Sequence, residues 1–78
     1  GISGPTLESV LVILREADQE LSAADVAEQA GISRGTARRY LEHLAAGGLA
    51  ELDLRYGTTG RPEHRYSWAG ELPTAHQQ

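Results

Sequence analysis

The sequence contains no cysteine and no lysine, and aromatic side chains make up only 5% of its 78 residues. The absence of cysteine excludes a disulfide framework and any thiolate metal site. The longest apolar run is Val10–Leu14, which is far shorter than the ~18–20 residues that a membrane-spanning helix needs. No basic, apolar N-terminal signal precedes this run. We therefore expect a soluble, cytoplasmic domain with no membrane partner.

The chain length allows one small domain. Apolar residues make up 40% of the chain, which supports a compact but thin core. Below roughly 80 residues such a core supplies only about 3–5 kcal/mol, so helix caps and turns must contribute to stability. We predict a linker over residues 1–5, a folded domain over residues 6–68 and a flexible C-terminal tail over residues 69–78.

The net charge of -4 is unevenly distributed along the chain. Residues 1–32 hold one arginine and six acids, whereas residues 33–68 hold six arginines and four acids. A local basic patch matters more for nucleic-acid binding than the total charge. The second half is therefore the candidate binding region, although the acidic total disfavours tight non-specific binding to DNA.

The first half has the apolar spacing of a helix. Apolar residues recur at intervals of three and four from Leu7 to Ala17, which predicts an amphipathic helix over residues 7–17 with Thr6 as its N-cap. After a polar turn, Leu21 is expected to make a short extended contact.

Two further helices follow, joined by a tight turn. Ser22 and Asp25 have the spacing of a capping box at the start of a helix over residues 23–30, which Gly31 ends. A third helix is predicted over residues 34–46. Two short helices joined through a glycine are typical of a helix-turn-helix.

Beyond this point the apolar period changes from 3.6 to 2. Alternation predicts a half-buried strand from Ala50 to Tyr56 and a second strand from His64 to Trp68, with a loop over residues 57–63. The predicted fold is α+β: a winged helix-turn-helix of three helices followed by a two-stranded β-hairpin, the wing. We expect the aromatic residues to lie in its core rather than to stack on nucleotides: Tyr40, Tyr56, Tyr66 and Trp68.

The third helix is the candidate recognition helix. Successive 100° steps turn its apolar residues inward and its arginines outward. Arginine is the commonest bidentate reader of guanine in the major groove, and recognition helices usually meet base edges near their N-termini. Arg34 and Arg38 are the better candidates for base reading, whereas Ser33, the predicted N-cap, and Thr36 could hold phosphate. The predicted DNA-binding residues of this helix are Ser33, Arg34, Gly35, Thr36, Arg38 and Arg39.

Two of these assignments have structural alternatives. The arginines could form a solvated face, with Arg38 paired to Glu42 four residues later. Gly35 costs roughly 0.5–1 kcal/mol relative to alanine inside a helix. It is either tolerated near the helix start or needed so that the backbone can approach the bases closely.

The wing tip contains Gly60-Arg61-Pro62. Pro62 favours an extended conformation at Arg61, which suits insertion into a narrow minor groove. Contact with the DNA backbone alone is the equal alternative, and Thr58 and Arg65 are predicted to add phosphate contacts.

No constellation in the sequence indicates an enzyme, a cofactor or a metal site. The three histidines are scattered over a helix, a strand and the tail, and they form no metal-ligand spacing. We therefore predict a protein that is not an enzyme and that uses no cofactor.

Two segments carry a family resemblance. The run Leu21–Leu44 contains Ser-Arg-x-Thr-Ala-Arg-Arg-Tyr-Leu, and the run Leu52–Tyr66 contains Tyr-Gly-Thr-x-Gly-Arg-Pro. Both resemble the C-terminal effector domain of CitB-type two-component response regulators, which respond to citrate and C4-dicarboxylates. The opening residues 1–7 resemble the linker that follows the receiver domain in that family.

The resemblance implies sequence-specific promoter binding under control of a phosphorylated receiver domain and its sensor histidine kinase. It would carry the family's DNA contacts over to Arg34, Thr36, Arg38, Arg39 and Arg61. Gly35 departs from the larger side chain that is usual in the family.

The residues alone are also compatible with two alternative assignments. The acidic first half would also suit a winged-helix module that binds another protein. Within the DNA-binding class, the chain is also similar to the N-terminal domain of IclR-like regulators, which would continue into an effector-binding domain. Binding as a homodimer to a symmetric operator would raise the affinity in either case.

Overall fold

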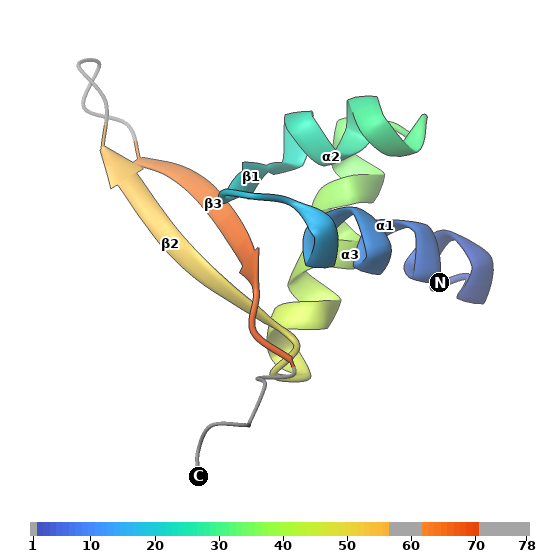
Figure 1. Cartoon of the computed structure of the whole chain (residues 1–78). Helices are drawn as coiled ribbons and strands as arrows, with labels where there is room; N and C mark the ends of the chain where they lie inside the picture. Colours follow the sequence, from blue (N-terminus) through green and yellow to red (C-terminus); the bar gives the residue numbers. More distant parts are fainter. Residues whose placement is uncertain (1, 57–61, 71–78) are drawn as a thin grey trace, which may run out of the picture.

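The computed structural model describes residues 2–56 and 62–70 of the chain. Three helices pack on one side of a small sheet, and a β-hairpin projects away from them (Figure 1). This arrangement confirms the predicted winged helix-turn-helix. The elements in chain order are α1 (Gly4–Glu16), β1 (Leu21–Ser22), α2 (Ala23–Ala30), α3 (Arg34–Ala46), β2 (Ala50–Tyr56) and β3 (Pro62–Trp68).

The sheet has three antiparallel strands in the order β1-β3-β2. We predicted only the two strands of the hairpin, so the description of the sheet as two-stranded was wrong. The extra strand is the segment that enters α2, where Leu21 pairs with Tyr66. Two residues are too short to show a period of 2, so the sequence indicated only an extended contact at Leu21.

The helix-turn-helix follows the predicted boundaries because its caps are strong. Ser22 and Asp25 form a complete capping box at the start of α2, and Gly31 ends that helix in the left-handed conformation with φ 73°. Ser33 then caps α3. The caps therefore determine where α2 begins and ends and where α3 begins, as local chemistry predicts.

Two element boundaries differ from our predictions. Helix α1 begins at Gly4, so Thr6 is not its N-cap; Ser3 holds the extended N-cap position and Pro5 lies in the first turn. Proline suits that turn because its missing N–H would have no partner there. Strand β3 begins at Pro62 rather than His64, and the first position of a strand is one that proline tolerates.

The core lies between the helices and the adjoining part of the sheet. The buried Tyr40 of α3 accepts a hydrogen bond at its hydroxyl from the Ser3 backbone N–H, over 2.8 Å. This contact ties the start of α1 to α3. The buried apolar residues are Val10, Leu14, Leu21, Val26, Ala27, Ala37, Tyr40, Leu41, Leu44, Ala50 and Tyr66.

The outer part of β2 is much more exposed than we predicted. Leu52, Leu54 and Tyr56 are 48%, 42% and 70% exposed, whereas Ala50 is buried. The prediction of a strand was correct, but the prediction that Tyr56 lies in the core was wrong. The hairpin extends beyond the helical layer (Figure 1), so nothing within the described residues covers the distal side chains.

Two of our predictions fall outside the described residues. These are the tip of the loop over residues 57–61 and most of the predicted tail, residues 71–78. Within the described ranges, no helix has the length and apolar character needed to cross a membrane.

We predict that Tyr66 makes the fold sensitive to alkaline pH. Burial raises the pKa of the Tyr66 phenol above its ordinary value of 10.0, and the nearby carboxylate of Glu42 adds to this rise. The unfolded chain then loses the proton at a lower pH than the folded chain. The contribution of Tyr66 to the free energy of unfolding should therefore be fully present well below pH 10.0 and be lost as the pH rises through the higher pKa of the folded chain.

Urea unfolding followed by circular dichroism, at neutral pH and above pH 10.0, tests this expectation. Tyr66→Phe should reduce the alkaline loss because it removes the titrating group. Equal losses in the wild-type chain and the variant would contradict the assignment to Tyr66.

Candidate nucleic-acid interface

The N-terminus of α3 is held by a compact hydrogen-bonded cap. The Ser33 hydroxyl accepts a hydrogen bond from the Thr36 backbone N–H over 3.1 Å and donates one to the Thr36 hydroxyl over 2.9 Å. The two hydroxyls therefore have a structural role, and the Thr36 hydroxyl keeps its own proton for a further acceptor. The remaining N–H groups of the first turn face outward at the positive end of the helix dipole.

The inner face of α3 packs as predicted. Ala37, Tyr40, Leu41 and Leu44 are buried, and this fixes the rotation of the helix about its axis. The opposite face exposes Arg34, Gly35, Arg38 and Arg39, with Thr36 half-buried between them. All six predicted positions of this helix, unlike Ala37 between them, are therefore exposed or partly exposed.

A shallow groove separates the start of α3 from the start of β3 in the hairpin. Its volume is about 340 Å³. Arg34 and Arg38, one helical turn apart, line one wall, and residues at the start of β3 line the other. The lining residues are Ser22, Ala23, Ala24, Arg34, Arg38, Pro62, Glu63, His64 and Tyr66.

The arginines of α3 are available for a partner. Arg38 Nε donates to a carboxylate oxygen of Glu42 over 3.0 Å, and the two side chains are 62% and 52% exposed. An exposed pair of this kind contributes only about 0–1 kcal/mol. Arg34 and Arg39 have no ion-pair partner among residues 2–56 and 62–70.

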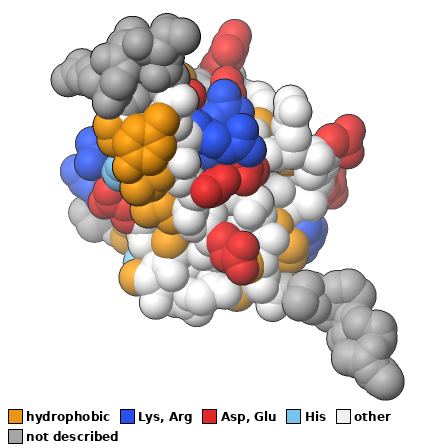
Figure 2. Space-filling model, turned by 90° about the vertical axis from the view of Figure 1, so that its left-hand side faces the viewer, with side chains coloured by type: hydrophobic (Ala, Val, Ile, Leu, Met, Phe, Trp, Pro, Cys, Tyr) orange, Lys and Arg blue, Asp and Glu red, His pale blue; other side chains and the backbone are white. Residues whose placement is uncertain are grey.

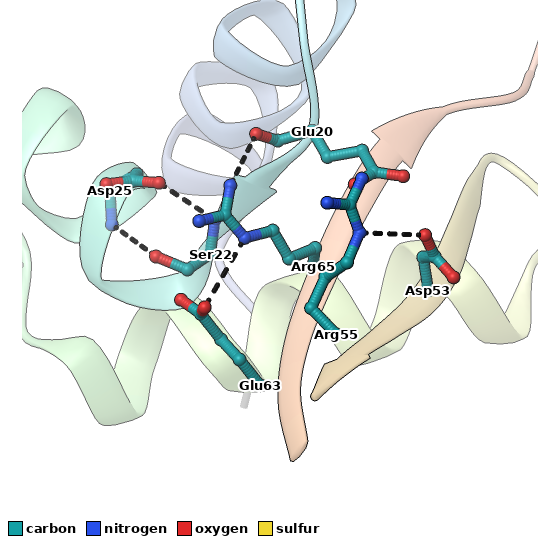
Figure 3. Close-up of polar contacts among 7 residues, drawn as sticks. All are labelled: Glu20, Ser22, Asp25, Asp53, Arg55, Glu63 and Arg65. Atoms are coloured by element: carbon teal, nitrogen blue, oxygen red, sulfur yellow. Dashed lines mark hydrogen bonds and ion pairs between the residues drawn. The ribbon is translucent and has the colours of Figure 1, made fainter. Parts of the chain in front are cut away.

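Arg65 does not join the α3 arginines. Side chains alternate along β3, so Arg65 projects from the face opposite to His64 and Tyr66, which line the groove. Its Nη1 donates to the Glu20 carbonyl oxygen over 3.4 Å, and its Nε lies 3.5 Å from a Glu63 carboxylate oxygen (Figure 3). The predicted phosphate contact of Arg65 is therefore separated from the helix by the thickness of the sheet.

The same outer face of the sheet holds a second arginine. The Arg55 guanidinium donates to carboxylate oxygens of Asp53, over 3.3 Å, and of Glu20. Figure 3 shows both arginines among these acids. The hydrogen bond to Asp53 and then the charge of Glu20 raise the pKa of Arg55. Arg55 is not among the predicted site residues, and because acids surround it, it presents little net positive charge.

The groove also has lining residues that the predicted site omitted, and Pro62 and His64 are two of them. Pro62 and His64 face Arg34 and Arg38 across the groove. The signal for His64 was present in the sequence, because alternation puts it on the same face of β3 as the buried Tyr66. Thr58 and Arg61, the predicted contacts at the wing tip, lie outside the described residues. No group of three or more potential metal ligands occurs in the described part of the chain.

An exposed arginine-bearing helix capped at its start, set across a groove from a β-hairpin, defines this chain as a winged helix-turn-helix domain. Residues 9–54 match the IclR helix-turn-helix domain family. The chain belongs to that family.

The chain is also similar to response regulators. It is 43% identical over 70 residues to a probable C4-dicarboxylate response regulator, DctR, of Bacillus subtilis, covering 90% of this chain and 31% of that protein. It is 46% identical over 67 residues to the transcriptional regulatory protein CitT of Halalkalibacterium halodurans, covering 85% of this chain and 29% of the relative. The transcriptional regulatory protein DpiA of Escherichia coli K12 is 39% identical over 66 residues, with the same coverage of both chains. The chain thus spans about a third of the length of these relatives.

Solved structures share the fold at low sequence identity. A PadR-like transcription factor from Bacteroides fragilis matches 86% of this chain and 68% of its own, with a TM-score of 0.70 and 21% identity. Human N-acetylserotonin methyltransferase matches 85% of this chain and 18% of its own, with a TM-score of 0.68 and 22% identity. Since the same fold occurs within a methyltransferase chain, the fold alone does not define the function.

We predict that Gly35 is not required for folding. A Cβ atom added to Gly35 would have no atom within 4 Å, and its φ is not in the left-handed region. Gly35→Ala should therefore raise the free energy of unfolding by about 0.5–1 kcal/mol. Gly31→Ala is the matched control and should lower it, because Gly31 adopts a φ of +73°.

Urea denaturation of the two variants measures both changes. A loss of stability in Gly35→Ala would contradict the prediction and would show that the fold itself needs this glycine.

Proposed function

We propose that this chain is the sequence-specific DNA-binding output domain of a bacterial two-component response regulator. The supporting observation is the exposed α3 face, where Arg34 and Arg38 line the groove beside the wing. The similarity to DctR, CitT and DpiA supports the regulatory class. This function needs neither a catalytic group nor a cofactor.

In the proposed complex, α3 enters the major groove. Arg34 and Arg38 read base edges, since each is long enough to reach a guanine and neither is held by more than an exposed ion pair. Arg39 contacts the adjoining phosphates, together with the first-turn N–H groups and Thr36. Ser33 can donate to a phosphate only if its hydroxyl releases that of Thr36. Gly35 has no side chain between these contacts, so the helix backbone can approach the bases closely.

The wing contacts DNA through its tip. Arg61 enters the minor groove or contacts the backbone, and Thr58 adds a phosphate contact. Arg65 contacts Glu20 and Glu63 in the free domain. It can therefore contact a phosphate only if DNA displaces it from these two residues. The contribution of Arg65 should therefore be smaller than that of the α3 arginines.

We further propose the partners that this role requires. The receiver domain of the full-length protein and its sensor histidine kinase would control the output domain, in the cytoplasm where the promoter lies. Asp18, Asp25 and Asp53 are not phosphoacceptor candidates, and Asp25 is already committed to the α2 capping box. Binding as a homodimer on DNA would link two half-sites and raise the affinity.

One observation favours a second candidate function, a winged-helix module for protein binding. The apolar side chains of outer β2 are exposed, and exposed apolar patches are typical of protein contacts. The net charge of -4 also disfavours contact with DNA through most of the surface.

We expect Arg38→Ala to lower the specific DNA-binding free energy by about 1–3 kcal/mol. The cognate duplex is first selected from random sequences with the wild-type domain, and affinities are then measured by fluorescence anisotropy. The matched control is Arg15→Ala, since Arg15 is exposed at the end of α1, away from the groove. Unchanged affinity in Arg34→Ala, Arg38→Ala and Arg39→Ala would exclude α3 as the recognition helix.

Salt dependence separates the two candidate functions. Binding to DNA should weaken steeply between about 50 and 200 mM salt because phosphate contacts release counterions. The loss of an arginine that contacts phosphate should reduce the slope of log affinity against log salt by about 1. An affinity that does not respond to salt would favour the protein-binding module instead.

A further inference from the structure

Strand β2 is an edge strand with an exposed apolar side. It lies at the end of the strand order β1-β3-β2, so one of its two edges has no neighbouring strand among the described residues. We call Leu52, Leu54 and Tyr56 the apolar stripe; all three face the same side of the sheet and are 42–70% exposed. The space-filling view shows hydrophobic side chains gathered in a continuous strip beside the grey wing tip (Figure 2).

Edge strands are usually protected against pairing, since they present a row of unpaired N–H and C=O groups. Common protection comes from lysine, proline or a bulge, and β2 has none of these among Ala50–Tyr56. Its only charges lie on the opposite side from the stripe, at Glu51, Asp53 and Arg55. As far as residues 2–56 and 62–70 are concerned, the edge is therefore open to another strand, and the charges determine which strand fits.

The sequence of β2 is complementary to itself. The segment Leu52-Asp53-Leu54-Arg55-Tyr56 reads apolar, acidic, apolar, basic, apolar. If two copies run antiparallel with Leu54 opposite Leu54, each Asp53 faces an Arg55 of the other copy, and each Leu52 faces a Tyr56. Residues directly opposite share one face of the sheet, so apolar side chains meet on one side and opposite charges on the other.

We infer that the apolar stripe and edge of β2 bind a second copy of this chain through antiparallel β2–β2 pairing centred on Leu54. The pairing places two Asp53–Arg55 contacts across the interface. Both side chains can reach a partner, because Arg55 is 57% exposed and Asp53 is 54% exposed despite their contact within the chain. The interface is a short strand pair, so we expect a weak dimer in the isolated domain.

The symmetry of this dimer has a structural consequence. The two-fold axis of an antiparallel strand pair is perpendicular to the sheet, so both sets of helices lie on the same side of one six-stranded sheet. Two recognition helices related by a two-fold axis match the symmetry of an inverted-repeat operator. That consequence rests on the proposed DNA-binding function, whereas the pairing itself can be measured without DNA.

A charge exchange tests the pairing by sedimentation equilibrium of the 78-residue chain in the absence of DNA. Asp53→Arg puts arginine opposite arginine in the dimer, and Arg55→Asp puts aspartate opposite aspartate. Each single variant should associate about tenfold more weakly than the wild type or worse, because like charges directly opposite destabilise a strand pair. Circular dichroism checks that both variants are folded.

Mixing the two single variants gives the decisive result. In a mixed pair the arginines of one variant face the aspartates of the other at both contacts, so association should return as a heterodimer. The double variant D53R/R55D should also restore association. A change that acted only within the chain, on the contacts of Arg55 with Glu20 and Asp53, would not be rescued by mixing.

Two further variants fix the register and separate the two proposals. Glu51→Arg should leave association unchanged, because Glu51 lies beyond the paired segment when Leu54 is central; a register centred on Asp53 would instead place Glu51 opposite Arg55. Arg38→Ala should also leave association unchanged, whatever it does to DNA affinity. Loss of DNA binding with normal association would count against the proposed function alone.

The inference is overturned by any of three results. The first is that the wild-type chain stays monomeric at millimolar concentration. The second is that the mixture of single variants fails to associate. The third is that the apolar stripe is protected from solvent only when duplex DNA is added. The last result would assign the stripe to the DNA interface.

Discussion

The packing of Tyr66 between the sheet and the helices is the contact on which the other features depend. This residue is almost completely buried, at 1% exposure, and it lies on β3 between Leu21 of β1 and Leu52 of β2. Its phenol is close enough to Arg38 and Glu42 of α3 for their charges to affect its pKa. One side chain thus joins the central strand to the recognition helix. Because Tyr66 also lines the groove, this packing helps to position the hairpin side of the groove relative to α3.

The central position of Tyr66 also divides the hairpin into two parts with different surroundings. Near the helices, residues on the same face of the hairpin as Tyr66 are buried, as Ala50 is. Farther along the hairpin, the same face continues as the exposed Leu52, Leu54 and Tyr56. The opposite face carries the charged groups around Arg55 and Arg65 throughout. Alternation along the strands therefore separates an apolar face from a polar face. Distance from the helices then determines whether a residue of the apolar face is buried in the core or belongs to the exposed apolar stripe.

In the proposed regulator, the start of α3 and the edge of β2 suit different partners. The start of α3 offers arginines that are held only by exposed contacts, whereas the arginines of the sheet are engaged by acids. The acids thus concentrate the available positive charge at the recognition helix, although the chain as a whole is negative. The apolar side chains of β2 lie on the same face of the sheet as Pro62 and His64, which line the groove, but on the edge strand, where they suit a second protein chain better than phosphate. Contact with DNA and association between copies therefore involve different residues, on α3 and on the edge of β2.

Local chemistry in the sequence was sufficient to determine the helix-turn-helix and its exposed arginines. The Ser22–Asp25 capping box, Gly31 and the Ser33 cap act within one or two turns, and the 3.6-residue period selects the buried face of α3. These features need no knowledge of distant residues. The family resemblance pointed to the same segment, and its contacts at the wing tip remain predictions.

Tertiary structure alone decided the third strand, the position of Arg65 and the exposure of Tyr56. A two-residue strand has no readable period, and its pairing with β3 depends on how the chain returns after the hairpin. A period of 2 shows which side chains share a face, but it does not show where the covering layer ends. For this reason the sequence identified β2 correctly and yet misplaced its distal aromatic residue in the core.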